Sequence, residues 1–493
     1  MKLIDSIDAL PRVDSFADLP PVFYTRLDPQ PLDQPRLLHA NVEVARMLGL
    51  SEAALARPEF LDVCAGTRGL SGGRTLAAVY SGHQFGVWAG QLGDGRAHLL
   101  GEVAGPEGNF ELQLKGSGLT PYSRMGDGRA VIRSSVREYL AGEAMAGLGI
   151  PTTRALALVT ARNPVYRETI ERAAVVTRVS PTFVRFGSFE HWTQRPEQMQ
   201  ILFDYVIDHF YPECRDASAG EAGGEHAVLL RFLRKVVARS ARMVADWQTA
   251  GFCHGVMNTD NMSITGLTLD YGPYGFMDAF EIDHICNHTD SQGRYAWNAQ
   301  PSVMHWNLYR LASSLSVLGP EADELREQLA YFEQDFLGAY QGNLVRKFGL
   351  RGWRDGDEVL VDDWWRLLHT QKADFTLSFR LLGAALHDAE PFLALFADRE
   401  AASGWLQDYR RRTELDASSD AERSEQMRTA NPVYILRNHL AETAIRAAEN
   451  DDAGEIETLL GLLRDPYTEK PGYESYAAQA PEWARELQVS CSS

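Results

Sequence analysis

Residues 254–261, His-Gly-Val-Met-Asn-Thr-Asp-Asn, decide the fold class of this 493-residue chain. Asn261, which ends the stretch, is followed nine residues later by Asp270, the first residue of an Asp-Tyr-Gly sequence. An amide oxygen and a carboxylate are hard oxygen ligands, which suit a Mg²⁺ ion that bridges nucleotide phosphates. The stretch therefore predicts a metal-dependent phosphate site.

The same stretch resembles the catalytic loop of protein kinases, whose pattern is H-R-D-x-x-x-x-N. His254 and Asn261 occupy the matching positions, and residues 270–272 stand where a kinase has Asp-Phe-Gly. The position of the catalytic aspartate, however, holds Val256. Two hypotheses follow, a kinase that has lost its base or an enzyme of another kind.

A lysine and a glutamate upstream fit the same pattern. Apolar and polar residues alternate over 110–115, which is the period of a half-buried strand, and residues 130–151 carry helical spacing. Lys115 ends the strand and Glu138 lies in the helix, in the order of the kinase ion pair that holds phosphate. A surface lysine and a solvated glutamate are the alternative.

The distribution of patterns predicts two lobes. Residues 70–115 are rich in glycine with short strand patterns, and long helical patterns follow residue 195, at 226–252, 323–349 and 361–386. We expect an α+β, protein-kinase-like fold with a β-rich N-lobe, a helical C-lobe and extensions at both ends. The expected divisions are residues 1–190 for the extension and N-lobe, 191–450 for the C-lobe and 451–493 for the tail.

Composition excludes several classes of protein. The net charge of −19, from 67 acidic and 48 basic residues, argues against general binding to nucleic acid or to anionic membranes. Acidic residues interrupt the apolar N-terminus, so it lacks a secretory signal, and no later segment is apolar for long enough to span a bilayer. Five cysteines without a CxxC pair do not make a disulfide framework or a zinc site. We expect a cytoplasmic protein.

Glycines and arginines could supply a phosphate site. Gly93 and Gly95 could let backbone N–H groups approach phosphate, and Arg96 follows them directly. Arg178 and Arg185 would come from a strand end and the loop after it. A turn with a surface arginine and exposed ion-pair partners are the alternatives for these residues.

Several long motifs together resemble the selenoprotein O family of pseudokinases, whose bacterial members include the YdiU proteins. The similarity extends over nearly the whole chain. The motifs are QLGDGRA at 91–97, ELQLKGSGLTPYSR at 111–124, GDGRAVIRSSVREYL at 126–140, TRVSPTFVRFGSFE at 177–190, HGVMNTDNMS at 254–263, LDYGP at 269–273 and the terminal CSS.

This resemblance implies a protein that binds ATP in a flipped orientation and transfers AMP to Ser, Thr or Tyr hydroxyls of proteins, itself included. It implies Asp260 as the proton acceptor, and Asn261 and Asp270 as ligands of Mg²⁺ or Mn²⁺. Lys115, paired with Glu138, would bind phosphate, and Asp270 would also contact the nucleotide. The other residues lining the nucleotide site would be Gly93, Gly95, Arg96, Asp127, Gly128, Arg178 and Arg185.

The resemblance also bears on the thiols and on the choice of reaction. Cys491 matches the selenocysteine or cysteine third from the end in the family, and its disulfide with Cys286 would suggest redox control. UMP transfer from UTP under Mn²⁺ is a variant of the same chemistry. The alternatives are a kinase that transfers the γ-phosphate and a non-catalytic scaffold that only binds nucleotide.

Overall fold

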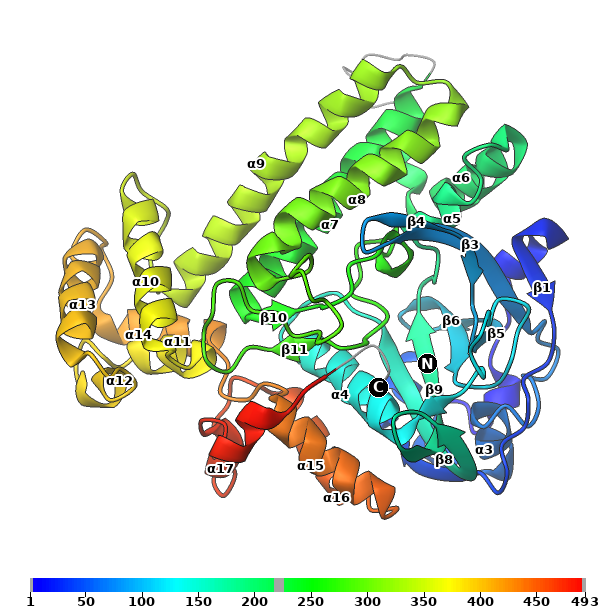
Figure 1. Cartoon of the computed structure of the whole chain (residues 1–493), viewed down its shortest axis with the longest axis horizontal. Helices are drawn as coiled ribbons and strands as arrows, with labels where there is room; N and C mark the ends of the chain where they lie inside the picture. The colour runs from blue at the N-terminus through cyan, green and yellow to red at the C-terminus, as the bar shows by residue number, and fades with distance from the viewer. Residues whose placement is uncertain (1–2, 217–225, 490–493) are drawn as a thin grey trace.

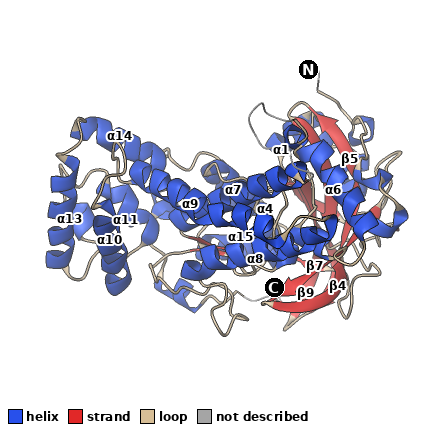
Figure 2. Ribbon diagram, turned by 90° about the horizontal axis from the view of Figure 1, so that it is seen from above, coloured by secondary structure: helices blue, strands red, loops and turns tan. Residues whose placement is uncertain are grey.

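The computed structural model describes residues 3–216 and 226–489. A β-rich N-terminal lobe lies beside an elongated set of helices from the C-terminal part of the chain (Figure 1). The strands gather at one end of the molecule, and α10, α11, α13 and α14 lie at the other end (Figure 2). The α+β fold with a β-rich N-lobe and a helical C-lobe is therefore confirmed. The divisions at residues 190 and 450 stay a prediction.

An antiparallel nine-stranded sheet forms the N-lobe within the described residues. Its spatial order is β1-β3-β5-β6-β9-β8-β2, with β4 paired to β3 and β7 paired to β9. The strands are β1 Tyr24–Arg26, β2 Arg36–Ala40, β3 Leu76–Gln84, β4 Val87–Gly93, β5 Ala97–Gly105, β6 Gly108–Lys115, β7 Ala130–Val131, β8 Arg154–Tyr166 and β9 Ile170–Ser180.

From Glu111 to Lys115, strand β6 is buried on both faces, so the half-buried strand expected for 110–115 is wrong in its exposure. Leu112 and Leu114 belong to a core shared with the N-terminal helices, whereas Gln113 and Lys115 are buried on the opposite face. The N-terminal helices are α1 Val42–Met47, α2 Glu52–Leu55 and α3 Pro58–Cys64. Because these helices cover the face of β6 that carries Leu112 and Leu114, the face with Gln113 and Lys115 points to the other side of the sheet.

Helix α4, Ile132–Gly147, confirms the expected helix and carries Glu138. It is buried along most of its length because it lies between the sheet and two late helices, α15 Asn438–Glu449 and α16 Gly454–Leu463 (Figure 1). The C-terminal part of the chain therefore returns to the N-lobe and clamps the helix that holds Glu138.

The helical lobe confirms two of the three long helical patterns. Helices α7, Ala227–Ala250, and α9, Ala322–Lys347, pack along each other, while the third pattern splits at Lys372, whose φ is +48°. The other helices of this lobe are α5 Phe186–Glu190, α6 Pro196–Phe210, α8 Gln300–Leu315, α10 Asp357–Gln371, α11 Phe375–Leu382, α12 Glu390–Leu393, α13 Arg399–Thr413 and α14 Asp420–Ala430.

Helix α7 leads directly into a two-stranded ribbon. Strand β10, Phe252–Cys253, pairs with β11, Gly275–Phe276, and the stretches 254–261 and 270–272 lie in the loop between them. The loop between these two strands therefore carries both predicted metal ligands, Asn261 and Asp270. In the described part of the chain, no helix combines the length and the apolar character needed to cross a bilayer.

The contact between α4 and α16 can be tested at Gly147, where a Cβ would overlap the carbonyl oxygen of Leu463. We expect Gly147→Ala to lower the free energy of unfolding by about 1–3 kcal/mol, because overpacking forces the backbone apart. Gly461→Ala in α16 is the matched control, since a Cβ there meets nothing within 4 Å. Equal denaturant midpoints for the two variants would refute the tight packing of α16 on α4.

Candidate active site

A cavity of about 460 Å³ lies between the sheet and the loops that follow β10. All the residues predicted to bind nucleotide or metal, and the predicted proton acceptor, line it. They are Gly93, Gly95, Arg96, Lys115, Asp127, Gly128, Arg178, Arg185, Asp260, Asn261 and Asp270. Their individual roles stay predictions, but the structure brings them together from separate segments of both lobes.

A chain of ion pairs joins the two lobes through this cavity. Lys115 Nζ donates to Oε2 of the Glu138 carboxylate, and Arg178 Nε donates to Oε1. Arg178 Nη2 lies 2.7 Å from Asp270 Oδ1, and Arg185 Nη1 donates to the other oxygen of Asp270. Because Glu138 comes from α4 and Asp270 from the C-lobe, the network fixes one lobe against the other.

The network keeps both carboxylates ionised. Burial opposes ionisation of Asp270, but the Arg185 and Arg178 guanidinium groups hold its pKa well below the usual range. Burial lowers the pKa of Lys115 to about 8, although Glu138 acts in the opposite direction. Three cations thus face two carboxylates, and the excess positive charge favours a bound phosphate chain.

The glycine turns bring backbone close to the cavity. Gly128 has a φ of +71°, and a Cβ there would overlap the backbone of Gly118.

Arg96 forms no ion pair within 3–216 and 226–489, which leaves its guanidinium available to phosphate. Asp127 is instead paired with Arg167, whose Nη1 lies 2.8 Å from Asp127 Oδ2. Sequence reasoning did not single out Arg167.

Asp260 differs from the other carboxylates of the cavity. Its Oδ2 accepts a hydrogen bond from Gln84 Nε2 at 3.2 Å, whereas its buried Oδ1 has no hydrogen-bond partner in the described residues. Burial raises the pKa of Asp260 to about 6. A carboxylate with one free oxygen and a pKa near neutrality is suited to accept a proton.

The end of β3 fixes the loop that carries Asp260. The His83 N–H donates to Thr259 Oγ1 at 2.7 Å, and the Thr259 hydroxyl donates to Glu190 of α5. The Phe85 N–H donates to Asn258 Oδ1 at 3.0 Å. Sequence reasoning missed these partners, because no spacing rule links the glycine-rich stretch around His83 to the loop.

The donor set of the cavity fits a divalent cation. Asn261 Nδ2 donates to the Val256 carbonyl at 3.0 Å, which fixes the amide and leaves Oδ1 for a metal. Asp270, held at a φ of +58°, keeps acceptor capacity beside its two arginines, because a carboxylate offers about four lone-pair sites. Mg²⁺ commonly takes one or two protein oxygens together with substrate phosphates and water.

Cys286 lies close to the end of the Asp270-Tyr271-Gly272 stretch, which Pro273 follows. Its Sγ is 3.1 Å from the Pro273 carbonyl oxygen, and burial raises the pKa of this thiol. The predicted partner Cys491 lies outside the described residues. The last described residue, Val489, accepts a hydrogen bond from the His288 N–H at 2.9 Å, so the described tail ends beside the Cys286 loop.

Comparison with known proteins gives a consistent result. A family model described as "Protein adenylyltransferase SelO" matches residues 9–464. A protein of Bordetella petrii named "Protein nucleotidyltransferase YdiU" is 63% identical over 488 residues, which cover 98% of each chain. A protein of the same name from Ralstonia nicotianae is 50% identical over 505 residues, covering 97% of this chain and 95% of its own.

Glu138→Gln tests the ion-pair network. Removing the charge leaves Lys115 buried without its ionic partner and Arg178 with Asp270 alone, so we expect a loss of about 3–5 kcal/mol in the free energy of unfolding and weaker ATP binding. Glu425→Gln is the control, because Glu425 pairs with Arg428 on the surface, and its denaturant midpoint should match the wild type. A Glu138→Gln protein with unchanged midpoint and ATP affinity would contradict the proposed importance of this network.

Proposed function

The chain belongs to the SelO family of protein adenylyltransferases and is a nucleotidyltransferase; we propose that it transfers AMP from ATP to Ser, Thr or Tyr hydroxyls of proteins, itself included. The carrying observation is the free, buried Oδ1 of Asp260 in the cavity that also holds Asn261 and Asp270. Val256 occupies the position of the kinase base, and in our proposal Asp260 takes over the role of that base.

In the proposed reaction a hydroxyl oxygen of the acceptor attacks the α-phosphorus of ATP. The bond between the α-phosphorus and the bridging oxygen breaks, and pyrophosphate leaves with that electron pair. Asp260 accepts the hydroxyl proton on its free oxygen, which requires the acceptor hydroxyl within hydrogen-bond reach. The nucleotide must therefore lie reversed relative to a kinase, with its α-phosphorus toward Asp260.

The side chains around Asp260 support this assignment. Gln84 holds one oxygen of the Asp260 carboxylate, and Arg185 Nη1 donates to its backbone carbonyl at 2.7 Å. A divalent cation on Asn261 and Asp270 would neutralise phosphate charge. Lys115 and Arg96 are placed to stabilise the charge that develops on pyrophosphate, because both line the cavity as cations.

Adenine itself takes no part in chemistry at the α-phosphorus. We therefore propose that UTP with Mn²⁺ can serve as a second donor, with transfer of UMP. A kinase reaction would need a base at the position of Val256, and its side chain offers none.

We also propose that a Cys286–Cys491 disulfide controls the cavity under oxidising conditions. The position of the Cys286 thiol beside Pro273 and the end of the described tail at Val489 support this pairing. A cytoplasmic location, which we propose because ATP is the donor, keeps thiols mostly reduced, so the bond would be conditional.

Parallel reactions with ATP labelled at the α- or the γ-phosphate test the proposed transfer. With Mg²⁺ present, we expect label from the α position alone on the protein and on a generic protein acceptor. Label from the γ position alone would restore the kinase hypothesis. Label from neither position, with ATP still bound, would favour the scaffold hypothesis.

Two variants separate the proposed base from the metal site. Asp260→Ala should abolish transfer while ATP binding stays close to wild type, because Asp260 acts on the acceptor hydroxyl. Asp270→Ala should weaken Mg²⁺-dependent ATP binding as well. Wild-type turnover by Asp260→Ala, measured with α-labelled ATP, would show that the base assignment is wrong.

The redox proposal is tested in the full chain with and without reductant. We expect oxidised wild-type protein to show a peptide that joins Cys286 to Cys491 and to change its transfer rate when reductant is added. Cys491→Ser should lose both effects, and Ser492→Ala is the control in the same tail. Equal rates in wild type with and without reductant, and no joined peptide, would remove the proposal.

A further inference from the structure

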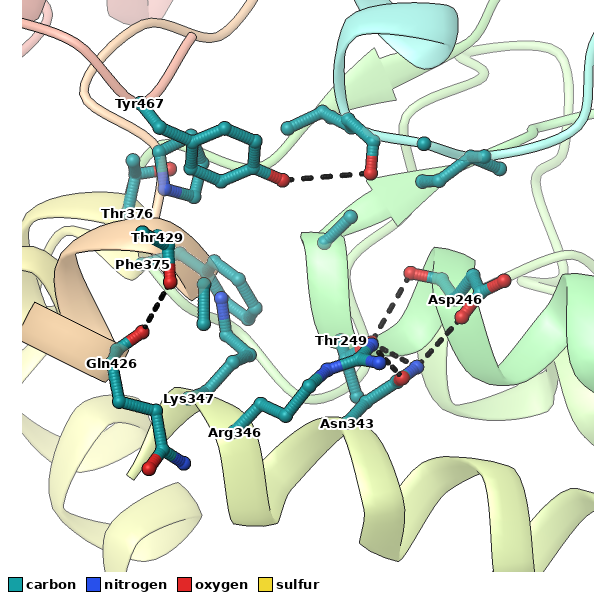
Figure 3. Close-up of a pocket in the computed structure, with 16 residues that line it drawn as sticks. Asp246, Thr249, Asn343, Arg346, Lys347, Phe375, Thr376, Gln426, Thr429 and Tyr467 are labelled. Carbon is teal, nitrogen blue, oxygen red and sulfur yellow. Dashed lines mark hydrogen bonds between the residues drawn. The ribbon is translucent and has the colours of Figure 1, made fainter. Parts of the chain in front are cut away.

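A second cavity, of about 340 Å³, lies in the helical lobe and shares no lining residue with the active site. It lies where the C-terminal ends of α7 and α9 meet the start of α11, the turn after α4 and Tyr467 (Figure 3). Since water occupies about 30 Å³ in the liquid, the cavity has room for about ten waters or a small metabolite.

Lys347 is a buried cation that lines this cavity without an ionic partner. Its exposed fraction is 7%, and in the described part of the chain its ammonium forms no ion pair and no hydrogen bond. The ammonium lies over the ring of Phe379, with 4.3 Å from Nζ to the ring centroid. Burying a charge without an opposite charge is costly, so the site favours an anion.

Arg346 adds a second cation to the same wall. Its Nη2 donates to Asn343 Oδ1 at 2.7 Å, and it forms no ion pair within residues 3–216 and 226–489. The carboxylate of the cavity, Asp246, is already engaged, because Arg242 Nε lies 3.0 Å from it and Asn343 Nδ2 donates to it at 2.7 Å. The cavity therefore carries excess positive charge in a chain of net charge −19.

Charged and aromatic side chains lie around the same cavity in Figure 3. Arg346 and Lys347 leave α9 toward the cavity, and Phe375 and Tyr467 bring aromatic rings to it. Ile150 from the turn after α4 also lines it. Cations beside apolar surface match a molecule with an anionic group and a short carbon skeleton.

We propose that this cavity binds a small organic anion whose carboxylate or phosphate group pairs with Lys347 and Arg346. The state of Lys347 supports the assignment, because burial, with Arg346 adding repulsion, lowers its pKa to about 7. A bound anion would restore the ammonium form. It would also supply the negative charge that the surrounding protein does not.

Lysine labelling in the full-length protein tests this site directly. The sequence has six lysines, so the acetylation of each one can be followed separately. Acetic anhydride is applied at neutral pH with inorganic phosphate, citrate or, at matched ionic strength, chloride, and acetylation is mapped by mass spectrometry. No other phosphate compound is added, and acetylation of Lys115 reports separately on anion binding in the active site. Exposed Lys372 is the internal control.

We expect phosphate or citrate at about ten times its dissociation constant to reduce acetylation of Lys347 about tenfold. Lys372 should be unchanged, and chloride should protect neither residue. Protection by phosphate alone identifies a phosphate ligand, and protection by citrate alone a carboxylate ligand. Equal labelling of Lys347 in all three salts would overturn the proposal.

Calorimetry provides a second measurement that does not depend on the reagent reaching Lys347. Phosphate or citrate can bind in both cavities, and the binding heat that comes from the second cavity should be seen for wild type and Lys372→Met. It should disappear in Lys347→Met, which keeps the length and apolar stem of the side chain. Equal heats for Lys347→Met and Lys372→Met, or no heat for wild type with either anion, would refute the site.

Discussion

The carboxylate of Glu138 is the group on which the active cavity depends. It holds Lys115 from β6 and Arg178 from β9, and Arg178 in turn reaches Asp270 across the cleft. Removing such charges from water costs several kcal/mol for each ion, so the network persists only because each charge has its partner. This requirement explains why α4 is enclosed on nearly every side. A tilt of α4 would leave Lys115 buried without an anion and Arg178 with Asp270 alone.

The cavity gives two carboxylates different surroundings, which shift their pKa values in opposite directions. Asp270 lies against Arg178 and Arg185, which hold its pKa low and keep it charged for a cation. Asp260 is buried with one oxygen free, and its pKa rises to about 6. Such a separation of pKa values supports the roles that we propose, a metal ligand for Asp270 and a proton acceptor for Asp260. An apolar Val256 is compatible with this proposal, because Asp260 and not residue 256 would accept the proton.

Local periodicity explains which parts of the architecture could be predicted from the sequence. The strand that ends at Lys115, the helix around Glu138 and the loop with Asn261 follow from spacing within single segments. Contacts between distant segments could not be predicted in this way. The clamp of His83 on the Asp260 loop and the return of α16 to α4 depend on tertiary packing.

The alternation in β6 was interpreted with the wrong exposure for the same reason. A period of two predicts which side chains share a face, but it does not tell what covers that face. Lys115 lines the cavity and Gln113 accepts a hydrogen bond from Arg178, so both are buried rather than in water. Polar residues of a strand can therefore mark a buried site.

The orientation of the nucleotide is the central claim, and a structure of the protein with a non-hydrolysable ATP analogue and Mg²⁺ tests it most directly. The distances from the free oxygen of Asp260 to the three phosphorus atoms are the quantity to measure. Our account predicts that the α-phosphorus is the nearest of the three. A complex in which the γ-phosphorus is nearest to Asp260 would contradict it.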